Sequence, residues 1–524
     1  MAKFNKISSV KVRKVQVPRG TNTPKRATKS LVTTNLAGGV AYTMKEKTEL
    51  VTILLTSFVA DQFYSKASDT TKRVAELMNK IVDKKFIAKA AIYARNEFGM
   101  RSISHVVAGQ LATEASIKGE TWPKDFYDQV VRRVDDMLEI VAYVWKDGKK
   151  PLPNSLKKGF RAAFNRFDGY QLSKYQANQG AFKLVDLVNL VHPTPTARNK
   201  DALDALVNGK LKNLTTSQTA LTNIGQQTSD ETERAELRKD YWTTVLQNKK
   251  LGYTDLVRSL TKIAKDAPEA VDLAVQNLTN PEAVKKSLVM PYQLYIAMKM
   301  VEKEIGATSE GRKLVRGLEQ AVELSCDNVP AFGGKTIVIV DRSGSMDSPL
   351  SNGKADVLSM AEVGTLMALF LARKNDTDFM IFGDEAKYVP YNANDSILTS
   401  VKTLLSYNRG YGHKSNYSVG HGTNFHATFA ALKGKYDRII FFSDMQGWAG
   451  GHYGCVSDLK SYEAKTGAKP FVYSHDLTGS GSLQIPEERT FVSAGFSEKV
   501  FDVMKLLEQD KEALVNAIEK NVQL

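Results

Sequence analysis

Residues 335–346 read KTIVIVDRSGSM, and this stretch decides the fold of the C-terminal part of the chain. The run at 335–340 is short, apolar and rich in β-branched residues, and a polar loop follows it directly. A strand buried in a parallel sheet has this composition, because helices cover both of its faces. We therefore predict a buried strand over 335–340, with a ligand-binding loop at its carboxyl end.

Strand-like and helix-like segments alternate from this point to the end of the chain. Further strands are predicted at 378–382, 437–442 and 470–476, and helices at about 354–373, 423–432, 455–466 and 498–521. Such alternation is typical of a doubly wound α/β domain. We assign residues 329–524 to this domain, with a boundary near 327–335.

The residues before this domain have a helical pattern almost throughout. Segments such as KTELVTILLTSFVADQFY (47–64) and TKRVAELMNKIVDK (71–84) carry apolar residues at three-four spacing, and short polar breaks separate them. Many helices with short connections suggest antiparallel pairs stacked as a solenoid. We therefore predict an all-α helical-repeat domain over 35–328, with repeats too degenerate to show a sequence signature.

The charge of the chain favours a polyanionic partner. The 524 residues carry 72 Lys and Arg against 57 Asp and Glu, a net charge of +15, although many basic proteins are simply soluble. Residues 1–34 form a basic N-terminal arm, which either tucks along a neighbour or is a solvated tail. The 42% apolar content supports folded cores rather than global disorder.

Cysteine content and hydropathy indicate a cytoplasmic protein. The two cysteines, Cys326 and Cys455, are far apart and cannot build a disulfide framework, which suits a reducing compartment. The N-terminus lacks the apolar core of a secretory signal, and no apolar stretch is long enough to span a bilayer. We therefore expect no membrane association.

Oxygen-bearing side chains follow two of the predicted strands and precede one predicted helix. Asp341, Ser343 and Ser345 occupy alternate positions after the first strand, Asp444 follows the strand at 437–442, and Thr423 begins the helix between them. Carboxyl ends of parallel strands converge on one crevice, and hard oxygen ligands suit Mg²⁺ or Mn²⁺ rather than zinc. The alternative is that the serines and Asp444 only cap helices.

This DxSxS, threonine and aspartate pattern resembles the metal-ion-dependent adhesion site of von Willebrand factor A domains. The resemblance implies that Asp341, Ser343 and Ser345 coordinate the ion directly or through water, that Thr423 is an optional direct ligand, and that Asp444 acts through water. A site with few direct carboxylates accepts an outside anionic oxygen, from a protein carboxylate or a phosphate. No second acid of a phosphatase type, GxSxG or phosphate loop is present, so we predict binding and no enzyme activity.

The histidines and a tyrosine-rich loop give weaker signals. His413, His421 and His426 lie close together, but no Cys pair or HExxH spacing joins them, which disfavours zinc. The loop at 407–421 is rich in Tyr, Gly, Arg and His. Such a loop either stacks on unpaired bases or covers the sheet edge as an ordinary surface loop.

Motifs along the whole chain resemble the Ro autoantigen family, which joins a TROVE module to an A-type domain, here in a bacterial or phage form. The matching segments are GGVAYTMKE (38–46), LPNSLKK (152–158), Lys174-Tyr175, LVHP (190–193), LVRSL (256–260) and FSD through WAGG (442–451). The resemblance implies a monomeric ring of HEAT-like helical repeats, bridged by a von Willebrand factor A-like domain.

The same resemblance implies noncoding RNA as the partner. Single-stranded 3′ ends of misfolded RNA would enter a basic central hole, where Arg258 and Lys262 fall one helical turn apart. Y-like RNA would bind the outer face, where Lys174 and His192 fall. Alternatively, His192 packs at a helix end and Arg258 pairs with an acid.

Two observations keep the functional prediction open. The family's second basic contact with Y RNA falls at Asn178 or Gln179, which weakens that part of the resemblance. A function of another class is also compatible with the sequence, namely a metal-dependent protein-interaction scaffold that uses the A-type domain without RNA.

Overall fold

The computed structural model describes most of the chain. It covers residues 32–35, 40–43, 45–56, 67–175, 182–211, 217–249, 251–287, 289, 291–326, 329–349, 358–408, 415–447, 455–478, 482–485, 489–494, 499–508 and 513–524. The basic arm up to residue 31, the positions 178 and 179, and residues 409–414 of the tyrosine-rich loop lie outside the described residues. No described helix combines the length and the apolar composition needed to cross a membrane.

The C-terminal part is built on a six-stranded sheet with the strand order β5-β4-β3-β6-β7-β9. Five of these strands run parallel, and β5 is an antiparallel edge strand. The strands are β3 (Thr336–Asp341), β4 (Thr377–Phe382), β5 (Ala386–Val389), β6 (Arg438–Ser443), β7 (Phe471–Asp476) and β9 (Thr490–Ala494). The sheet confirms the predicted α/β class and adds β5 and β9, which the sequence pattern did not indicate.

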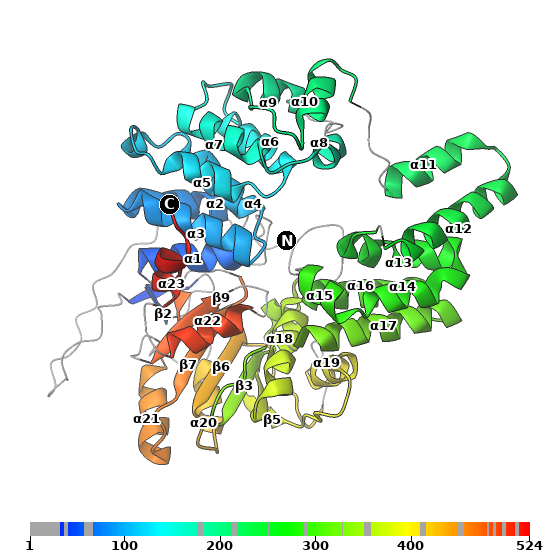
Figure 1. Ribbon diagram of the computed structural model, residues 1–524. Coiled ribbons are helices and arrows are strands. Elements are labelled where there is room, and N and C mark those ends of the chain that lie inside the picture. Colours follow the sequence, from blue (N-terminus) through cyan, green and yellow to red (C-terminus); the bar gives the residue numbers. More distant parts are fainter. Residues whose placement is uncertain are drawn as a thin grey trace, which may run out of the picture.

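Helices cover both faces of this sheet (Figure 1). Alternate residues of β3 belong to two different cores: Val338 and Val340 pack with one set of helices, and Ile337 and Ile339 with the other. The first set is α18 (Met360–Lys374), α19 (Ile397–Ser406) and α22 (Lys499–Leu507), and the second is α20 (Phe425–Ala431) and α21 (Val456–Thr466). The domain is therefore doubly wound.

The N-terminal part is a curved array of helices (Figure 1). It follows an arc that leaves the α/β part at α1 and returns to it at α17. The helices are α1 (Glu46–Thr56), α2 (Ala67–Lys80), α3 (Lys84–Glu97), α4 (Ser102–Leu111), α5 (Pro123–Val130), α6 (Val134–Val144), α7 (Asn154–Phe164), α8 (Gly169–Tyr175), α9 (Leu184–Val191), α10 (Lys200–Val207), α11 (Ser217–Gln227), α12 (Glu231–Gln247), α13 (Tyr253–Asp266), α14 (Val271–Leu278), α15 (Pro281–Ser287), α16 (Pro291–Ile305) and α17 (Ser309–Ser325).

Local sequence explains how individual helices of the arc begin and which face they bury. Asp83 caps α3, because its carboxylate accepts a hydrogen bond from the Phe86 N–H at 3.0 Å. In α13 the residues Leu256, Leu260 and Ile263 recur at three-four spacing and are buried. Polar side chains occupy the opposite face of α13.

The two ends of the arc are both fastened to the α/β part. At the first end, Lys47 and Lys89 contact Glu519 of α23 (Ala513–Asn521) at 3.3 and 3.2 Å. At the second end, Lys402 of α19 contacts Glu302 of α16 at 2.7 Å. The α/β part therefore bridges the arc.

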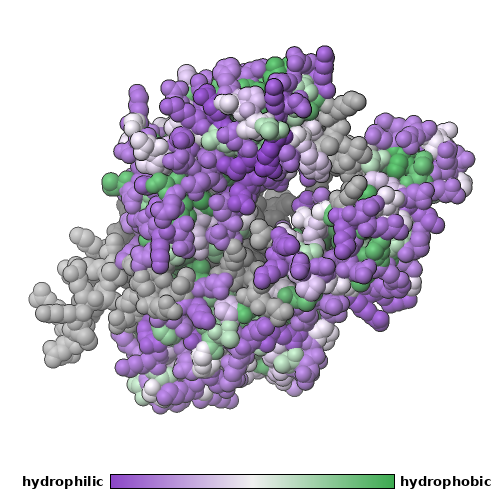
Figure 2. Space-filling model, in the orientation of Figure 1, coloured by the Kyte–Doolittle hydropathy of each residue, from purple (hydrophilic) through white to green (hydrophobic). Residues whose placement is uncertain are grey.

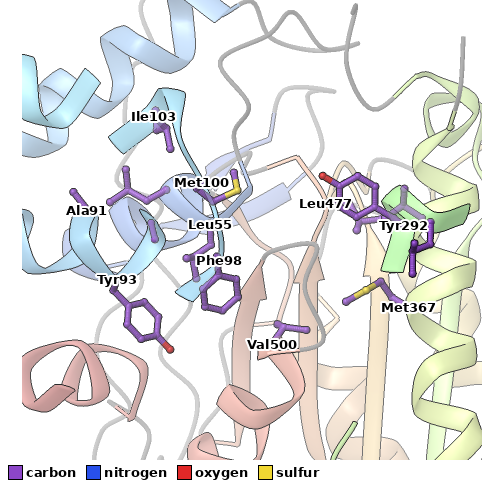
Figure 3. Packing of buried hydrophobic residues seen from close by; sticks show 14 of the residues in the cluster. Leu55, Ala91, Tyr93, Phe98, Met100, Ile103, Tyr292, Met367, Leu477 and Val500 are labelled. Atoms are coloured by element: carbon purple, nitrogen blue, oxygen red, sulfur yellow. The ribbon is translucent and has the colours of Figure 1, made fainter. Parts of the chain in front are cut away.

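One hydrophobic core runs through both parts of the molecule (Figure 3). Its members include Leu55 and Phe98 of the first helices and Val500 of α22. They also include Tyr292 of α16 and Met367 of α18 at the other end of the arc. Buried apolar contact, and not only surface ion pairs, thus joins the arc to the sheet domain.

Two segments toward the ends of the chain differ from the prediction. Residues 32–43 contain strands where an arm and an all-α domain were expected, and residues 498–521 contain two helices where one was expected. Strands β1 (Val32–Thr34) and β2 (Val40–Thr43) form a small sheet with β8 (Ser482–Leu483), so residues from both ends of the chain pair. The prediction of a single helix over 498–521 is wrong. The segment is two helices, because α22 packs against β9 whereas α23 packs against α1 and α3, and one straight helix cannot serve both surfaces.

Candidate metal centre and nucleic-acid surface

The carboxylate of Asp341 lies buried at the end of β3, beside the end of β6. Its Oδ1 accepts a hydrogen bond from the Ser343 N–H at 2.8 Å, and its Oδ2 accepts one from the Ser443 hydroxyl at 2.6 Å. The parallel pairing of β3 and β6 produces this contact, since it places both strand ends at one sheet edge. Ser443 was not among the residues predicted for the site.

The other predicted ligands gather around the same point. The hydroxyl oxygens of Ser343 and Ser345 are 3.2 Å apart, and Ser345 is hydrogen-bonded to the Asp444 carboxylate. Thr423 is buried on a loop that touches the turn, because the Gly344 N–H donates to the His421 carbonyl at 2.9 Å. The structure therefore joins four of the five predicted ligands by hydrogen bonds and sets the Thr423 loop beside them.

The capping alternative does not describe these side chains. The Ser343 side chain makes no capping hydrogen bond to the short 3₁₀ turn Gly344–Asp347 that follows it. The next helix, α18, is capped by Ser359, whose hydroxyl accepts from the Glu362 N–H at 3.2 Å. The position before α21 is Cys455 and not Asp444.

Electrostatics make this cluster a suitable cation site. Burial raises the pKa of the Asp341 carboxyl, although hydrogen bonds from Ser343 and Ser443 oppose the shift. Burial also raises the pKa of Asp444, and the negative charges of Asp341 and Asp476 add to this effect. A divalent cation would relieve both the desolvation and the repulsion. The donors are all hard oxygens, so the residues present fit Mg²⁺ or Mn²⁺.

Arg342 lies beside the cluster and ties together the loops around it. Its buried guanidinium donates to the Asn408 carbonyl at 2.5 Å, and the Asn408 amide donates back to the Arg342 carbonyl at 3.1 Å. The same amide donates to the Gly420 carbonyl at 2.8 Å. Arg342 and Asn408 therefore fix the two loops that flank the site.

The four predicted RNA contacts are distributed over two parts of the arc. Lys174 is exposed in α8, and His192 is exposed at the end of α9 in a left-handed conformation with φ of 52°. Arg258 and Lys262 are exposed on one face of α13, and neither forms an ion pair with a described residue. The structure thus brings Arg258 and Lys262 together, apart from Lys174 and His192.

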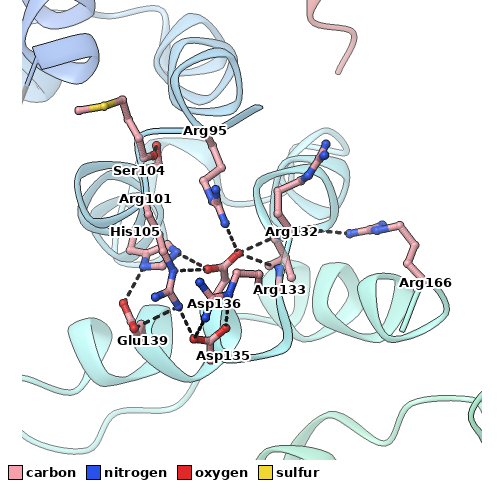
Figure 4. Close-up of polar contacts among 12 residues, drawn as sticks. Arg95, Arg101, Ser104, His105, Arg132, Arg133, Asp135, Asp136, Glu139 and Arg166 are labelled. Carbon is pink, nitrogen blue, oxygen red and sulfur yellow. Dashed lines mark hydrogen bonds and ion pairs between the residues drawn. The ribbon is translucent and has the colours of Figure 1, made fainter. Parts of the chain in front are cut away.

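A buried charge cluster in the arc was not foreseen (Figure 4). Asp136 of α6 accepts hydrogen bonds from Arg95 at 2.9 Å, from Arg101 at 2.7 Å and from His105 at 3.1 Å, and from the two backbone N–H groups before α6. Burial alone would raise the pKa of Asp136, but these partners hold it far below its usual range. The arginines are committed to structure, because they link α3, α4 and α6.

A second group of potential metal ligands lies between α20 and α21. It consists of His426, Cys455 and Asp458, whose ligand atoms lie within 4.8 Å of one another. The sequence spacing gave no sign of it, because His426 is far from the other two residues along the chain.

Comparisons with known proteins cover nearly the whole chain. The TROVE domain family matches residues 40–262. The chain is 21% identical over 527 residues to the RNA-binding protein RO60 of Deinococcus radiodurans, a match that covers 90% of this chain and 94% of that protein. It is 27% identical over 140 residues to rat telomerase protein component 1, which covers 25% of this chain and only 5% of that protein.

A solved structure has the same fold. The crystal structure of the Deinococcus radiodurans Ro (Rsr) protein matches with a TM-score of 0.56 at 18% identity, over 91% of this chain and 100% of that one. The helical arc and the bridging α/β domain are therefore shared. The chain is thus similar to the Ro family over most of its length, and its match to the TROVE domain runs from β2 to α13.

Proposed function

We propose that this chain is an RNA-binding component of a ribonucleoprotein. The observation that carries the proposal is the pair of exposed cations on α13, Arg258 and Lys262, which lie one turn apart without acidic partners among the described residues. Unpaired cations at this spacing suit successive phosphates of one strand. The TROVE domain match and the Deinococcus relative, which is named as an RNA-binding protein, support the same class of ligand.

The opening of the arc is the proposed binding site for a single RNA strand. Figure 2 shows a hollow between the two arms of the arc, with hydrophilic side chains on both sides. The net charge of +15 favours entry of a polyanion. We infer that single-stranded 3′ ends of misfolded noncoding RNA pass into this opening in a monomeric ring.

The outer surface near α8 and α9 is the proposed contact for a small structured RNA. Lys174 and His192 are both exposed there, and His192 ends α9 in a left-handed conformation. A Y-like RNA suits this surface, because structured RNA is recognised by its shape and its backbone.

The oxygen cluster at the sheet edge is proposed to bind Mg²⁺, with Mn²⁺ as the alternative. Asp341, Ser343, Ser345, Thr423 and Asp444 would hold the ion directly or through water. When bound, the ion supplies a positive charge that attracts a phosphate or a partner carboxylate.

The test is a paired variant on α13. Arg258→Ala with Lys262→Ala should weaken single-strand RNA binding about tenfold or more, which corresponds to ~1.4 kcal/mol. The slope of log K against log salt should become smaller by roughly 0.7 for each lost phosphate contact. The control is Lys265→Ala on the same helix, because Lys265 is engaged with Glu304 at 3.3 Å. Unchanged affinity and slope in the paired variant would count against the proposal.

The alternative is a metal-dependent protein scaffold. The buried, oxygen-only cluster around Asp341 favours it, since such a site can grip a partner's carboxylate. It predicts that Asp341→Ala or a chelator abolishes capture of the protein partner. It also predicts that the chain does not bind RNA at any salt concentration.

A further inference from the structure

Three different ligand types meet where α20 packs against α21. His426 lies in the first turn of α20, Cys455 is the residue before α21, and Asp458 lies in its first turn. The His426 Nδ1 and an Asp458 oxygen are 2.6 Å apart, and the Cys455 sulfur completes a group within 4.8 Å. The apolar contacts of Phe425, Phe429 and Leu459 in the second core hold the two helices together.

The chemistry of this group differs from that of the oxygen cluster. An imidazole nitrogen, a thiolate sulfur and a carboxylate oxygen are together a zinc donor set, whereas Mg²⁺ avoids sulfur. Tetrahedral zinc, with bonds of about 2.0–2.3 Å, places its ligand atoms roughly 3.3–3.7 Å apart. The His426 and Asp458 ligand atoms are closer than this at 2.6 Å and the whole group lies within 4.8 Å, so an ion would enter between His426 and Asp458.

The exposure of the three side chains fits an ion that enters from solvent. The His426 and Asp458 side chains are 23% and 34% exposed, whereas Cys455 is buried. The thiol therefore forms the inner wall, and the other two ligands lie at the entrance. A three-ligand site of this kind leaves a fourth position for water.

We propose that His426, Cys455 and Asp458 form a zinc site with one water ligand, separate from the Asp341 cluster. Burial and the nearby Asp458 charge raise the pKa of the Cys455 thiol to about 12. Zinc would bind this sulfur as the thiolate, so the thiol proton would leave when the ion enters.

The site has a consequence for the neighbouring oxygen cluster. Asn424 caps α20 by accepting from the Ala427 N–H at 3.3 Å, and it directly follows Thr423. Zinc would fix α20 to α21 and so stiffen the loop that carries Thr423. This coupling rests on the proposed Mg²⁺ site, whereas the zinc site itself does not.

The test uses Co²⁺ as a spectroscopic substitute for zinc on the full chain, purified with a chelator and reduced. We expect one equivalent of Co²⁺ to give a thiolate-to-cobalt charge-transfer band, and Zn²⁺ to abolish it by displacement. Cys455→Ser should remove the band. His426→Ala should weaken binding at least tenfold, because even the loss of an outer partner of a ligand costs about that much.

Two control variants show whether the band arises at Cys455. Cys326→Ser removes the other buried cysteine, at the end of α17, and should keep the band. Asp341→Ala should also keep it, so that failure of the Mg²⁺ proposal and failure of the zinc proposal are distinguishable. Absence of the band in the unmodified chain, or its persistence in Cys455→Ser, would overturn the zinc site.

Discussion

At the scale of single residues, the buried Asp136 is the charge on which the first helices depend. Its carboxylate accepts hydrogen bonds from Arg95, Arg101 and His105, which come from two neighbouring helices (Figure 4). Breaking a buried ion pair by removing one partner is strongly destabilising, because the remaining charges stay buried without compensation. Asp136 therefore acts as a structural clamp for α3, α4 and α6.

We predict that Asp136→Asn lowers the free energy of local opening of α3, α4 and α6 by about 3–5 kcal/mol, as measured by amide hydrogen exchange. The control is Glu139→Gln, whose side chain is 46% exposed and should contribute less than about 1 kcal/mol. If Asp136→Asn lowered the free energy of opening no more than the control does, the structural role proposed for Asp136 would be contradicted.

The pH dependence of this cluster follows from His105. Burial lowers the pKa of His105, but its hydrogen bonds to Asp136 and Glu139 outweigh burial and raise the pKa above the ordinary value of 6.5. The folded state therefore binds the proton more tightly than the unfolded state. This stabilisation should be complete below about pH 6.5 and should fade as the pH rises through the raised value. Hydrogen exchange of α4 at two pH values checks this, and stabilisation that grows with pH would contradict it.

The sequence was informative at residue scale where chemistry is local. The alternation Asp341, Ser343 and Ser345 indicated a cluster after a strand, and the structure joins these residues by hydrogen bonds. The proposed zinc ligands were not predictable, since only the packing of α20 on α21 brings His426 to Cys455. The Asp136 cluster was missed for the same reason.

At the scale of elements, periodicity identified the helices well but not their partners. The apolar pattern from 498 to 521 is consistent with one helix, and only tertiary contact divides it into α22 and α23. Strands β5 and β9 are short edge strands, and their pairing depends on neighbours far along the chain. A local pattern cannot carry that information.

The contact of α23 with the first helices yields an element-scale prediction. Ile518 is fully buried, and α23 packs against α1 and α3. Ile518→Ala should destabilise this contact by about 2–5 kcal/mol and make the C-terminal helix accessible to limited proteolysis. Lys520→Ala, an exposed position on the same helix, should leave proteolysis unchanged. Equal cleavage of the two variants would contradict the role of Ile518.

At the scale of the whole molecule, an arc of helices is bridged by an α/β domain through a shared core (Figures 1 and 3). Helical periodicity predicted a solenoid, and the resemblance to the Ro family implied that it curls. The curvature itself is the sum of many small rotations between neighbouring helices, which no single segment encodes. The proposed function belongs to this scale, because it needs both arms of the arc.

The most direct measurement compares two RNA hairpins that differ only in a single-stranded 3′ tail. We predict that the tailed hairpin binds at least about tenfold more tightly at moderate salt, with a log K against log salt slope that steepens by roughly 0.7 for each tail phosphate engaged. Equal affinities and equal slopes for the two hairpins would contradict the claim that the arc receives an unpaired strand.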